Sequence, residues 1–196
     1  GGLTTITEAA AVGCVYTLGL GCLVYRNLRW RDIWEALVST VSFCGVVFFL
    51  LGASTVLGWF VTRSGIARDA AEAITLVSTD PSVQILAVVV LLIVIGMFID
   101  VLPAIVVSAP VLAPALIQLG FDPLHVGMVM LLALNLGNIT PPVGMTIMTA
   151  ARIAGVPYEA VIRQSLPFMV SHLVVIVLAA LLPDLVLWFP RLIGAI

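Results

Sequence analysis

Long apolar segments alternate with short polar ones along the whole chain. A helix needs about 20 mostly apolar residues to cross a bilayer. Segments of this kind predict membrane-spanning helices at 9–25, 36–61 and 166–188. The second contains "GAST" (Gly52–Thr55), which is expected to kink or locally unwind that helix. The pattern is typical of an all-α integral membrane protein with several spans.

Two polar stretches separate these spans from the rest. Directly after the first span, three arginines alternate with two tryptophans: Arg26, Arg29, Trp30, Arg31 and Trp34. Aromatic rings favour headgroup depth and arginines favour phosphates, so this stretch predicts a short interfacial helix. Residues 62–82 are polar enough to lie outside the bilayer, as a short amphipathic helix that ends at Asp80-Pro81.

Two further apolar elements are each interrupted by helix-breaking residues. In the first, the aliphatic run 83–99 stops at "FIDVLP" (Phe98–Pro103) before a second apolar run resumes. In the second, "NLGNITPPVG" (Asn135–Gly144) separates a short helix from another at 145–154. Proline has no backbone N–H and disfavours helix in the residue before it. Each element is therefore predicted to consist of two short helices separated by a non-helical break.

Composition excludes several classes of protein. The chain has 196 residues, of which 62% are hydrophobic and 9% charged, against about 45–50% and 25% in soluble domains. No basic cluster suited to nucleic acid is present. The sequence has no P-loop, zinc-protease or nucleophile-elbow motif, so it gives no support for ATP use or hydrolysis.

The breaks predict a polar site. Lipid offers no hydrogen bonds, so unwound backbone at membrane depth is tolerated only inside protein or beside a watery cavity. Carbonyls at the end of a helix suit a cation, and N–H groups at the start of the next suit a carboxylate. Neutral oxygens of Asn135, Asn138 and Thr140 suit Na⁺ better than a transition metal. The plainer alternative is a proline kink that only shapes the helix.

Asp100 is the only ionisable residue between Asp80 and Asp122. A charge within a membrane segment is costly and usually functional. Two compatible interpretations are a cation ligand and an N-cap of the following half-helix. Thr5 and Glu8 have the spacing of a capping box, with a role at a domain joint as the alternative.

Two stretches of the amino-acid sequence resemble those of a known protein family. "GGLTTITEAAAV" and "GMFIDVLPAIVVSAPVLAPALIQLGFDPLHVGMVMLLALNLGNITPPVGM" are similar to the C-terminal half of the large membrane subunit of tripartite ATP-independent periplasmic (TRAP) transporters, the DctM-like permeases. The likeness covers nearly the whole chain and is densest from Gly96 to Gly144. We therefore expect the chain to be the C-terminal half of a longer polypeptide, and to need the N-terminal half for transport.

The resemblance implies a function and its partners. Such permeases take up organic acids, often C4-dicarboxylates, with Na⁺ as the coupling ion, no other cofactor and no enzymatic reaction. A periplasmic substrate-binding protein delivers the acid, and a small membrane subunit pairs with the large one in the bacterial inner membrane. The fold implied is half of an inverted-repeat, elevator-type transporter with one re-entrant hairpin and one broken helix.

By this likeness the chain divides into five segments: 1–35 with the first span and interfacial helix, 36–81 with the second span and polar connection, 82–123 as the re-entrant hairpin, 124–156 as the broken helix, and 157–196 with the last span. The two breaks would then share one Na⁺ site, with no other metal. Its predicted contributors are Asp100, Asn135, Gly137, Asn138 and Thr140. The predicted substrate-carboxylate site is Val143, Gly144, Met145 and Thr146.

Three rival functions stay open at this point. A related dicarboxylate/Na⁺ symporter would need no binding protein. A membrane-embedded enzyme would require His125 or His172 within hydrogen-bond reach of Asp100, although both histidines are expected to be packing residues. A structural anchor would tolerate substitution of the Gly, Asn and Pro residues of the second break.

Overall fold

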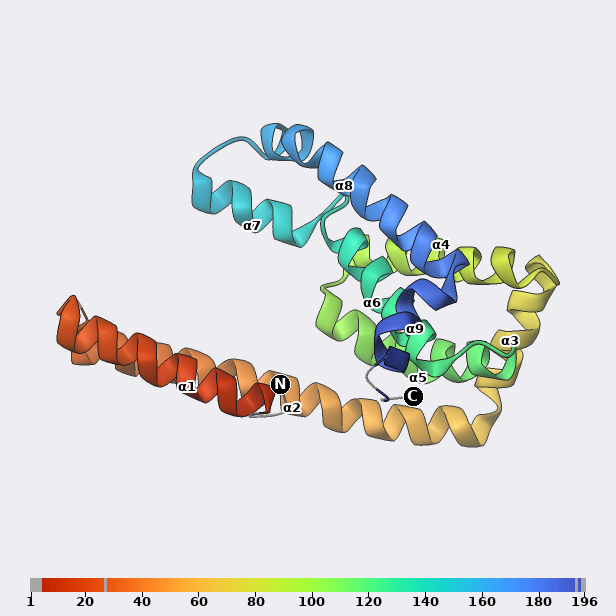
Figure 1. Ribbon diagram of the computed structural model, residues 1–196, viewed down its shortest axis with the longest axis horizontal. Coiled ribbons are helices and arrows are strands. Elements are labelled where there is room, and N and C mark those ends of the chain that lie inside the picture. The colour runs from red at the N-terminus through yellow and green to blue at the C-terminus, as the bar shows by residue number, and fades with distance from the viewer. Residues whose placement is uncertain (1–4, 27, 193, 195–196) are drawn as a thin grey trace. The chain divides into compact units, whose positions relative to one another are not determined.

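A computed structural model describes residues 5–26, 28–192 and 194 of the chain (Figure 1). Residues 1–4, 27, 193 and 195–196, which belong to the first and last predicted segments, lie outside the described part. The chain forms two compact units, Gly1–Phe49 and Leu50–Ile196, and each is described by itself. The described residues form helices joined by short turns, with no strand among them. The all-α prediction is confirmed.

Five helices of the described part are long and apolar enough to cross a membrane: Thr7–Val24, Trp30–Ser64, Pro81–Phe98, Val101–Gln118 and Tyr158–Leu181. Two shorter apolar helices, Pro123–Asn138 and Met145–Ala154, accompany them. Most of the large side chains on these helices are apolar whether or not they are buried, as expected where lipid is the solvent. The prediction of an integral membrane protein is confirmed.

The first unit begins with α1 (Ile6–Gly19), which continues into the π-helical turn η1 (Leu20–Val24). The Thr5 hydroxyl accepts a hydrogen bond from the Glu8 amide at 3.3 Å. The Glu8 carboxylate accepts one from the Thr5 amide at 2.8 Å. The capping-box interpretation is therefore confirmed, because both reciprocal bonds are present.

Helix α2 (Trp30–Ser64) runs without interruption, which makes two predictions wrong. The interfacial stretch is not a separate helix, because the Asp32 carboxylate accepts from the Arg29 amide at 2.8 Å and starts α2 there. The local unwinding expected at "GAST" is absent, because α2 is continuous through these residues. At 1.5 Å per residue, α2 is about 50 Å long, so it exceeds the ~30 Å hydrocarbon core or tilts within it.

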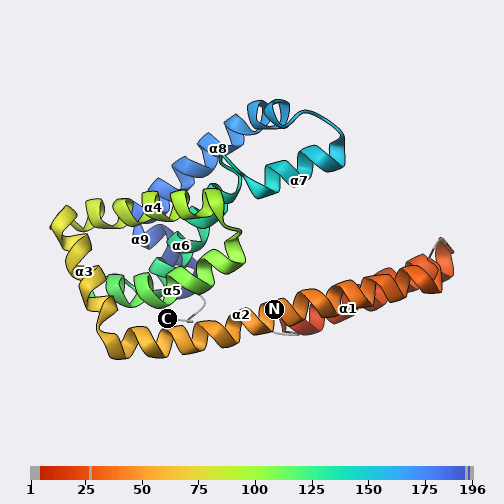
Figure 2. The same ribbon diagram turned by 180° about the vertical axis from the view of Figure 1, so that it is seen from behind.

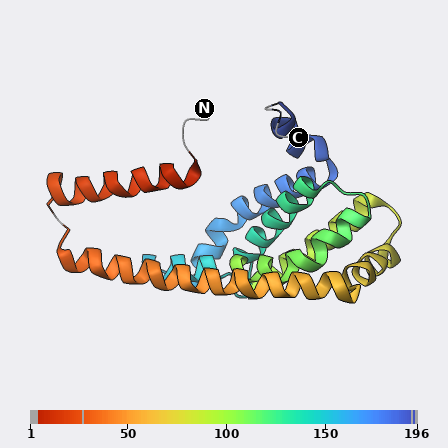
Figure 3. The ribbon, with the colours of Figure 1, turned by 90° about the horizontal axis from the view of Figure 1, so that it is seen from below.

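The second unit is built around α6, and Figure 2 shows it from behind. Its helices are α3 (Ile66–Val77), α4 (Pro81–Phe98), α5 (Val101–Gln118), α6 (Pro123–Asn138), α7 (Met145–Ala154), α8 (Tyr158–Leu181) and α9 (Pro183–Leu192). The chain doubles back between α4 and α5 (Figure 1). Helix α6 packs against α4, α5 and α8, and Figure 3 shows the ribbon from below.

The core of this unit lies along α6 and the faces that cover it. Its largest fully buried side chains come from four helices: Ile85, Leu92, Leu116, Met130, Leu134 and Ile176. Among the described residues, the buried polar side chains are Gln84, His125 and Asn138, which lie near helix ends, and Ser108, which lies in the middle of α5. The predicted amphipathic helix in residues 62–82 is present as α3.

Both broken elements begin in the same way. Asp80 caps α4 by accepting from the Ser82 amide at 2.8 Å, and Asp122 caps α6 by accepting from the Leu124 amide at 2.8 Å. In each, proline follows the aspartate at the start of the helix, where its missing N–H costs nothing. Asp-Pro therefore sets the starting point of each element.

The predicted last span at 166–188 is wrong at both ends. Helix α8 begins eight residues earlier, at Tyr158, and ends at Leu181. Pro183 then starts α9. Proline disfavours helical backbone in the residue before it, and Leu182 accordingly has φ −120° and ψ 78°.

Candidate functional site

The first break is short and capped by its own acid. Only Ile99 and Asp100 are non-helical, so the predicted interruption at Phe98–Pro103 is too long. Pro103 lies in the first turn of α5, where proline is tolerated. The Asp100 carboxylate accepts from the Val101 amide at 2.8 Å, which confirms its N-cap role.

The second break is longer and has no side-chain cap. Helix α6 extends to Asn138, beyond the predicted end, and α7 starts at Met145 as predicted. Gly144 precedes α7 with φ 52°, in the left-handed region, and no side chain caps the helix. Of α7's first amides, the earliest with an intrahelical partner is that of Met148, which donates to the Gly144 carbonyl at 2.9 Å. The N–H groups before it are available to an anion.

The carbonyls at the end of α6 are partly used by the break itself. The Leu136 carbonyl accepts from the Ile139 amide at 3.2 Å and from the Thr140 hydroxyl at 2.6 Å. The Gly137 carbonyl accepts from the Thr140 amide at 2.9 Å. Any cation at this break would therefore draw mainly on side-chain oxygens.

Three polar side chains from the two breaks form one hydrogen-bonded cluster. The Asn138 amide nitrogen donates to the Asp100 carboxylate at 3.2 Å and to the Thr146 hydroxyl at 3.0 Å. Asn138 ends α6, Asp100 begins α5 and Thr146 lies in the first turn of α7. Residues 38 positions apart in sequence are thus brought into contact at the helix ends.

An open hollow of about 440 Å³ lies beside this cluster. Its lining residues are Asp100, Asn138, Met145, Thr146, Thr149, Ala150 and Ile153. Asp100 is the only ionisable side chain among them. The hollow therefore combines one negative charge with amide and hydroxyl groups and the N-terminal turn of α7.

Asn138 is buried with part of its hydrogen-bonding capacity unused. The residue is only 8% exposed. Within the described residues, its Oδ1 atom has no hydrogen-bond partner. A buried polar atom without a partner is costly and requires an explanation, such as a bound ion or water. Asn138 lines the hollow, but its Oδ1 atom is enclosed and its amide nitrogen faces Asp100 and Thr146. Turning the amide over would direct Oδ1 toward these two groups.

Tyr158 holds the second break in place. Its hydroxyl donates to the Val143 carbonyl at 2.9 Å, with the Pro142 carbonyl at 3.3 Å. A Cβ atom on Gly144 would lie 3.3 Å from that hydroxyl and 3.3 Å from the Thr140 carbonyl. The backbone leading into α7 is therefore fixed from α8.

The structure does not bring all the predicted Na⁺ ligands together. Asn135 is exposed and its amide donates to the Leu131 carbonyl of its own helix at 2.9 Å. Thr140 lines a separate apolar groove between α4, α6 and α8. Gly137 is helical and packs against α4. Of the five predicted residues, Asp100 and Asn138 meet at the hollow.

The predicted carboxylate-binding residues also divide. Met145 and Thr146 line the hollow. Val143 and Gly144 shape the backbone behind it through their contacts with Tyr158. Sequence reasoning missed Thr149, which lines the hollow, and Tyr158, which contacts the second break from α8. No local pattern in the sequence marks a residue that contacts a remote break.

His125 is placed far from the cluster. It is 1% exposed, and its Nε2 atom is 2.8 Å from the Ala179 carbonyl. It lies near the start of α6, about 20 Å along the helix from Asn138 at 1.5 Å per residue. This confirms the expected packing role. The hydrogen bonds found for Asp100 are with Val101 and Asn138.

Comparison with known proteins places the chain among permeases. Residues 1–185 match the family described as "Tripartite ATP-independent periplasmic transporter, DctM component". The chain is 35% identical to the sialic acid TRAP transporter large permease protein SiaM of Vibrio cholerae, over 97% of this chain and 45% of that protein. It is 34% identical to the ectoine TRAP transporter large permease protein TeaC of Halomonas elongata, over 96% of this chain and 44% of that protein.

A third relative is the C4-dicarboxylate TRAP transporter large permease protein DctM of Pseudomonas aeruginosa, 30% identical over 98% of this chain and 45% of that protein. The chain thus spans less than half the length of each of these three relatives. The match nevertheless includes both breaks and the hollow between them. The chain belongs to the DctM component family of tripartite ATP-independent periplasmic transporters.

Proposed function

We propose that the hollow at the two breaks binds Na⁺ together with the carboxylate of an organic acid, and that the chain is part of a permease that couples uptake of the acid to Na⁺. The observation that carries this proposal is the contact between the Asp100 carboxylate and Asn138, whose buried Oδ1 atom has no hydrogen-bond partner among the described residues. Family membership supports transport by a tripartite assembly over a receptor-independent symporter or an enzyme.

The donor set suits a monovalent cation. Asp100 supplies one negative charge and Thr146 a hydroxyl. Asn138 would supply its amide oxygen with the amide turned over, so that a cation contact replaces its hydrogen bonds to Asp100 and Thr146. All three are hard oxygen ligands. One carboxylate neutralises one positive charge, whereas a divalent ion would leave the hollow with excess charge. The ends of broken helices near membrane depth commonly hold Na⁺ in secondary transporters.

The N-terminal turn of α7 suits the carboxylate of the substrate. Its uncapped amides carry the partial positive charge of the helix dipole, and Met145 and Thr146 face the hollow. Thr146 belongs both to this turn and to the Asn138 cluster. The cation and the acid would therefore lie next to each other.

This adjacency gives a physical reason for coupling. Without a cation, the Asp100 carboxylate repels a second carboxylate within the same hollow. A bound Na⁺ removes that repulsion, so each ligand raises the affinity for the other by the same factor. Uptake of the acid would then follow the Na⁺ gradient.

The proposed assembly follows from the family. The complete large permease would lie in the bacterial inner membrane with a small membrane subunit and receive its acid from a periplasmic substrate-binding protein. By analogy with the named relatives, sialic acid and C4-dicarboxylates are the substrates to test first. In this assembly 82–123 would be the re-entrant hairpin and 124–156 the broken spanning helix.

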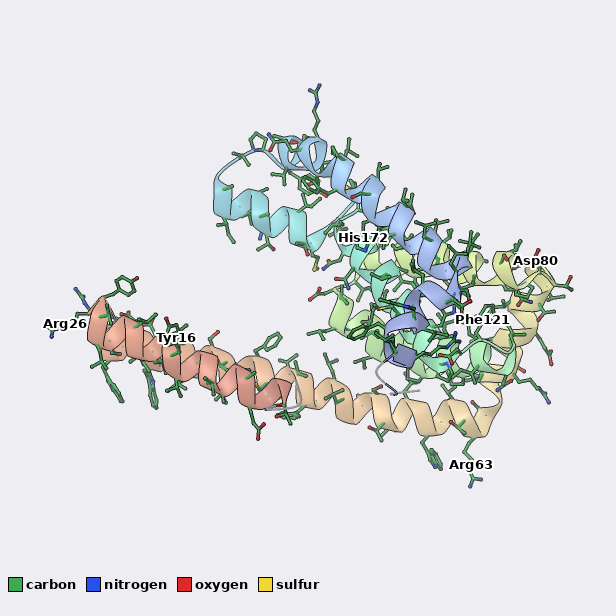
Figure 4. The ribbon with its side chains drawn as sticks, in the orientation of Figure 1. Tyr16, Arg26, Arg63, Asp80, Phe121 and His172 are labelled. Carbon is green, nitrogen blue, oxygen red and sulfur yellow. The ribbon has the colours of Figure 1, made fainter. Side chains whose placement is uncertain are left out.

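The test is Na⁺-driven uptake by the complete transporter in proteoliposomes. Asp100→Asn and Asn138→Ala should raise the Na⁺ concentration needed for half-maximal uptake. Asp122→Asn is the matched control, because Asp122 also caps a helix but lies at the start of α6. Its neighbour in sequence, Phe121, is labelled in Figure 4. Unchanged Na⁺ dependence in both site variants would place the cation elsewhere.

A further inference from the structure

Helices α4 and α6 cross with their backbones in direct contact. A Cβ atom on Gly96 would lie 2.6 Å from the Leu134 carbonyl oxygen and 3.1 Å from the Gly137 Cα atom. A Cβ atom on Gly137 would lie 2.7 Å from the Gly96 Cα atom. Because these neighbours are backbone atoms, a rotamer change cannot relieve the overlap. Any side chain at either position forces the two helices apart.

The crossing lies within four residues of both site residues along the chain. Gly137 directly precedes Asn138, and Gly96 is four residues before Asp100. Both glycines are buried, whereas Asp100 lies in the break just beyond α4. A displacement at the crossing is therefore passed to the ends of α4 and α6 with little chain to absorb it.

The required displacement is large compared with the tolerance of the site. Moving the Gly96 contact from 2.6 Å to the 3.4 Å of ordinary van der Waals contact takes about 0.8 Å. The Asn138–Asp100 hydrogen bond is already 3.2 Å long, at the upper end of the normal range. A shift of this size would break it and enlarge the space between the two ligand groups.

We propose that Gly96 and Gly137 are positioning residues that set the spacing between the Asp100 carboxylate and the Asn138 amide, and thereby the affinity for Na⁺. The inference rests on the proposed Na⁺ site. A purely structural role would predict less folded protein and slower maximal uptake, with an unchanged half-saturating Na⁺ concentration. A positioning role changes that concentration in the molecules that do fold.

The experiment measures Na⁺-dependent uptake by the complete transporter carrying Gly96→Ala or Gly137→Ala. The half-saturating Na⁺ concentration should rise about tenfold or more, as is typical when a group that orients an ion's ligand is disturbed. Gly127→Ala is the matched control, because Gly127 is also in α6 and an added Cβ meets nothing within 4 Å. A half-saturating concentration equal to that of Gly127→Ala would overturn the inference.

Asp100→Asn, measured in parallel, separates the two proposals. If Asp100→Asn shifts the Na⁺ dependence and the glycine variants do not, the positioning role fails and the Na⁺ site stands. If Asp100→Asn also leaves the dependence unchanged, the Na⁺ site itself fails, and the positioning role with it.

A further variant covers the case in which neither glycine variant folds. Asn138→Gln keeps the amide and lengthens its side chain by one methylene group. With a spacing fixed by the crossing, the longer side chain cannot fit, and the half-saturating Na⁺ concentration should again rise about tenfold. If the half-saturating Na⁺ concentration of Asn138→Gln equalled that of the wild type, the spacing between Asp100 and residue 138 would not be fixed by the crossing, and the inference would be overturned.

Discussion

The two broken elements begin alike and break differently. Both α4 and α6 start at an Asp-Pro pair whose aspartate caps the helix. The break after α4 contains two residues, and Asp100 caps the next helix. The break after α6 contains six residues, Ile139–Gly144, and leaves the next helix without a side-chain cap.

Because of this difference, the first break carries negative charge and the second carries partial positive charge. The first presents a carboxylate, which attracts a cation. The second presents unpaired amides at a helix N-terminus, which attract an anion. Two breaks with the same chemistry would duplicate a single site, whereas this pair provides adjacent positions for ions of opposite charge.

The largest expected effect comes from Asp100→Ala, which removes both features of the first break. Loss of the only ionisable group at the hollow should raise the half-saturating Na⁺ concentration at least about tenfold, and loss of the cap should cost about 1 kcal/mol of stability. Asp100→Asn, which keeps a capping group, should show only the first effect. The measurement is the melting temperature of the complete complex in Na⁺ and in K⁺. If Na⁺ raised the melting temperature of Asp100→Ala as much as that of the wild type, the assignment of the cation to the first break would be contradicted.

Gly144→Ala tests the backbone of the second break. A left-handed conformation costs a residue with a side chain about 1–2 kcal/mol, and the added Cβ would also crowd the Tyr158 hydroxyl at 3.3 Å. A lower melting temperature and weaker binding of the acid are expected. Gly155→Ala is the control, since Gly155 has φ 65° but open space around it. Equal losses in the two variants would show that crowding at the break has no role.

Tyr158→Phe removes the hydroxyl that holds the second break. The lost hydrogen bond to the Val143 carbonyl should cost about 1 kcal/mol, which corresponds to roughly a fivefold higher KM for the acid if it acts on binding. The half-saturating Na⁺ concentration at saturating acid should not change. Tyr16→Phe, at an exposed position of α1, is the matched control. If Tyr158→Phe changed the half-saturating Na⁺ concentration and left the KM for the acid unchanged, the second break would bind the cation instead of the acid.

Asn135→Ala should have the smallest effect. The side chain is exposed and donates only to the Leu131 carbonyl of its own helix in the described structure. Stability should stay within about 0.5 kcal/mol of wild type, with an unchanged half-saturating Na⁺ concentration in the uptake assay. A shift as large as that of Asn138→Ala would mean that the wrong face of α6 has been assigned to the cation.

Much of the helical arrangement follows from local sequence. The start of α7 at Met145 and the capping box at Thr5 and Glu8 agree with prediction. The errors arise where a helix tolerates residues that often end one. Gly52–Thr55 stays helical inside α2, and Pro103 fits the first turn of α5. Local propensity is weak enough for long apolar helices to override it.

The candidate site was predictable only in part. Asp100 stands out as an isolated charge, and the second break stands out by its prolines. Nothing in the sequence separates Asn138 from Asn135, because the two lie only three residues apart at the end of the same helix. The packing of α6 against α4 decides that Asn138 faces Asp100 and Asn135 does not.

The sequence by itself determined that this protein lies in a membrane and that its helices are interrupted within Phe98–Pro103 and Asn135–Gly144, because apolar length and the missing N–H of proline act within a few residues. Only the tertiary structure decided which polar groups meet at those breaks. That choice depends on helices distant in sequence, whose approach is limited by backbone contact at Gly96 and Gly137. A spacing of this kind is a property of two packed surfaces, and no single stretch of the chain contains it.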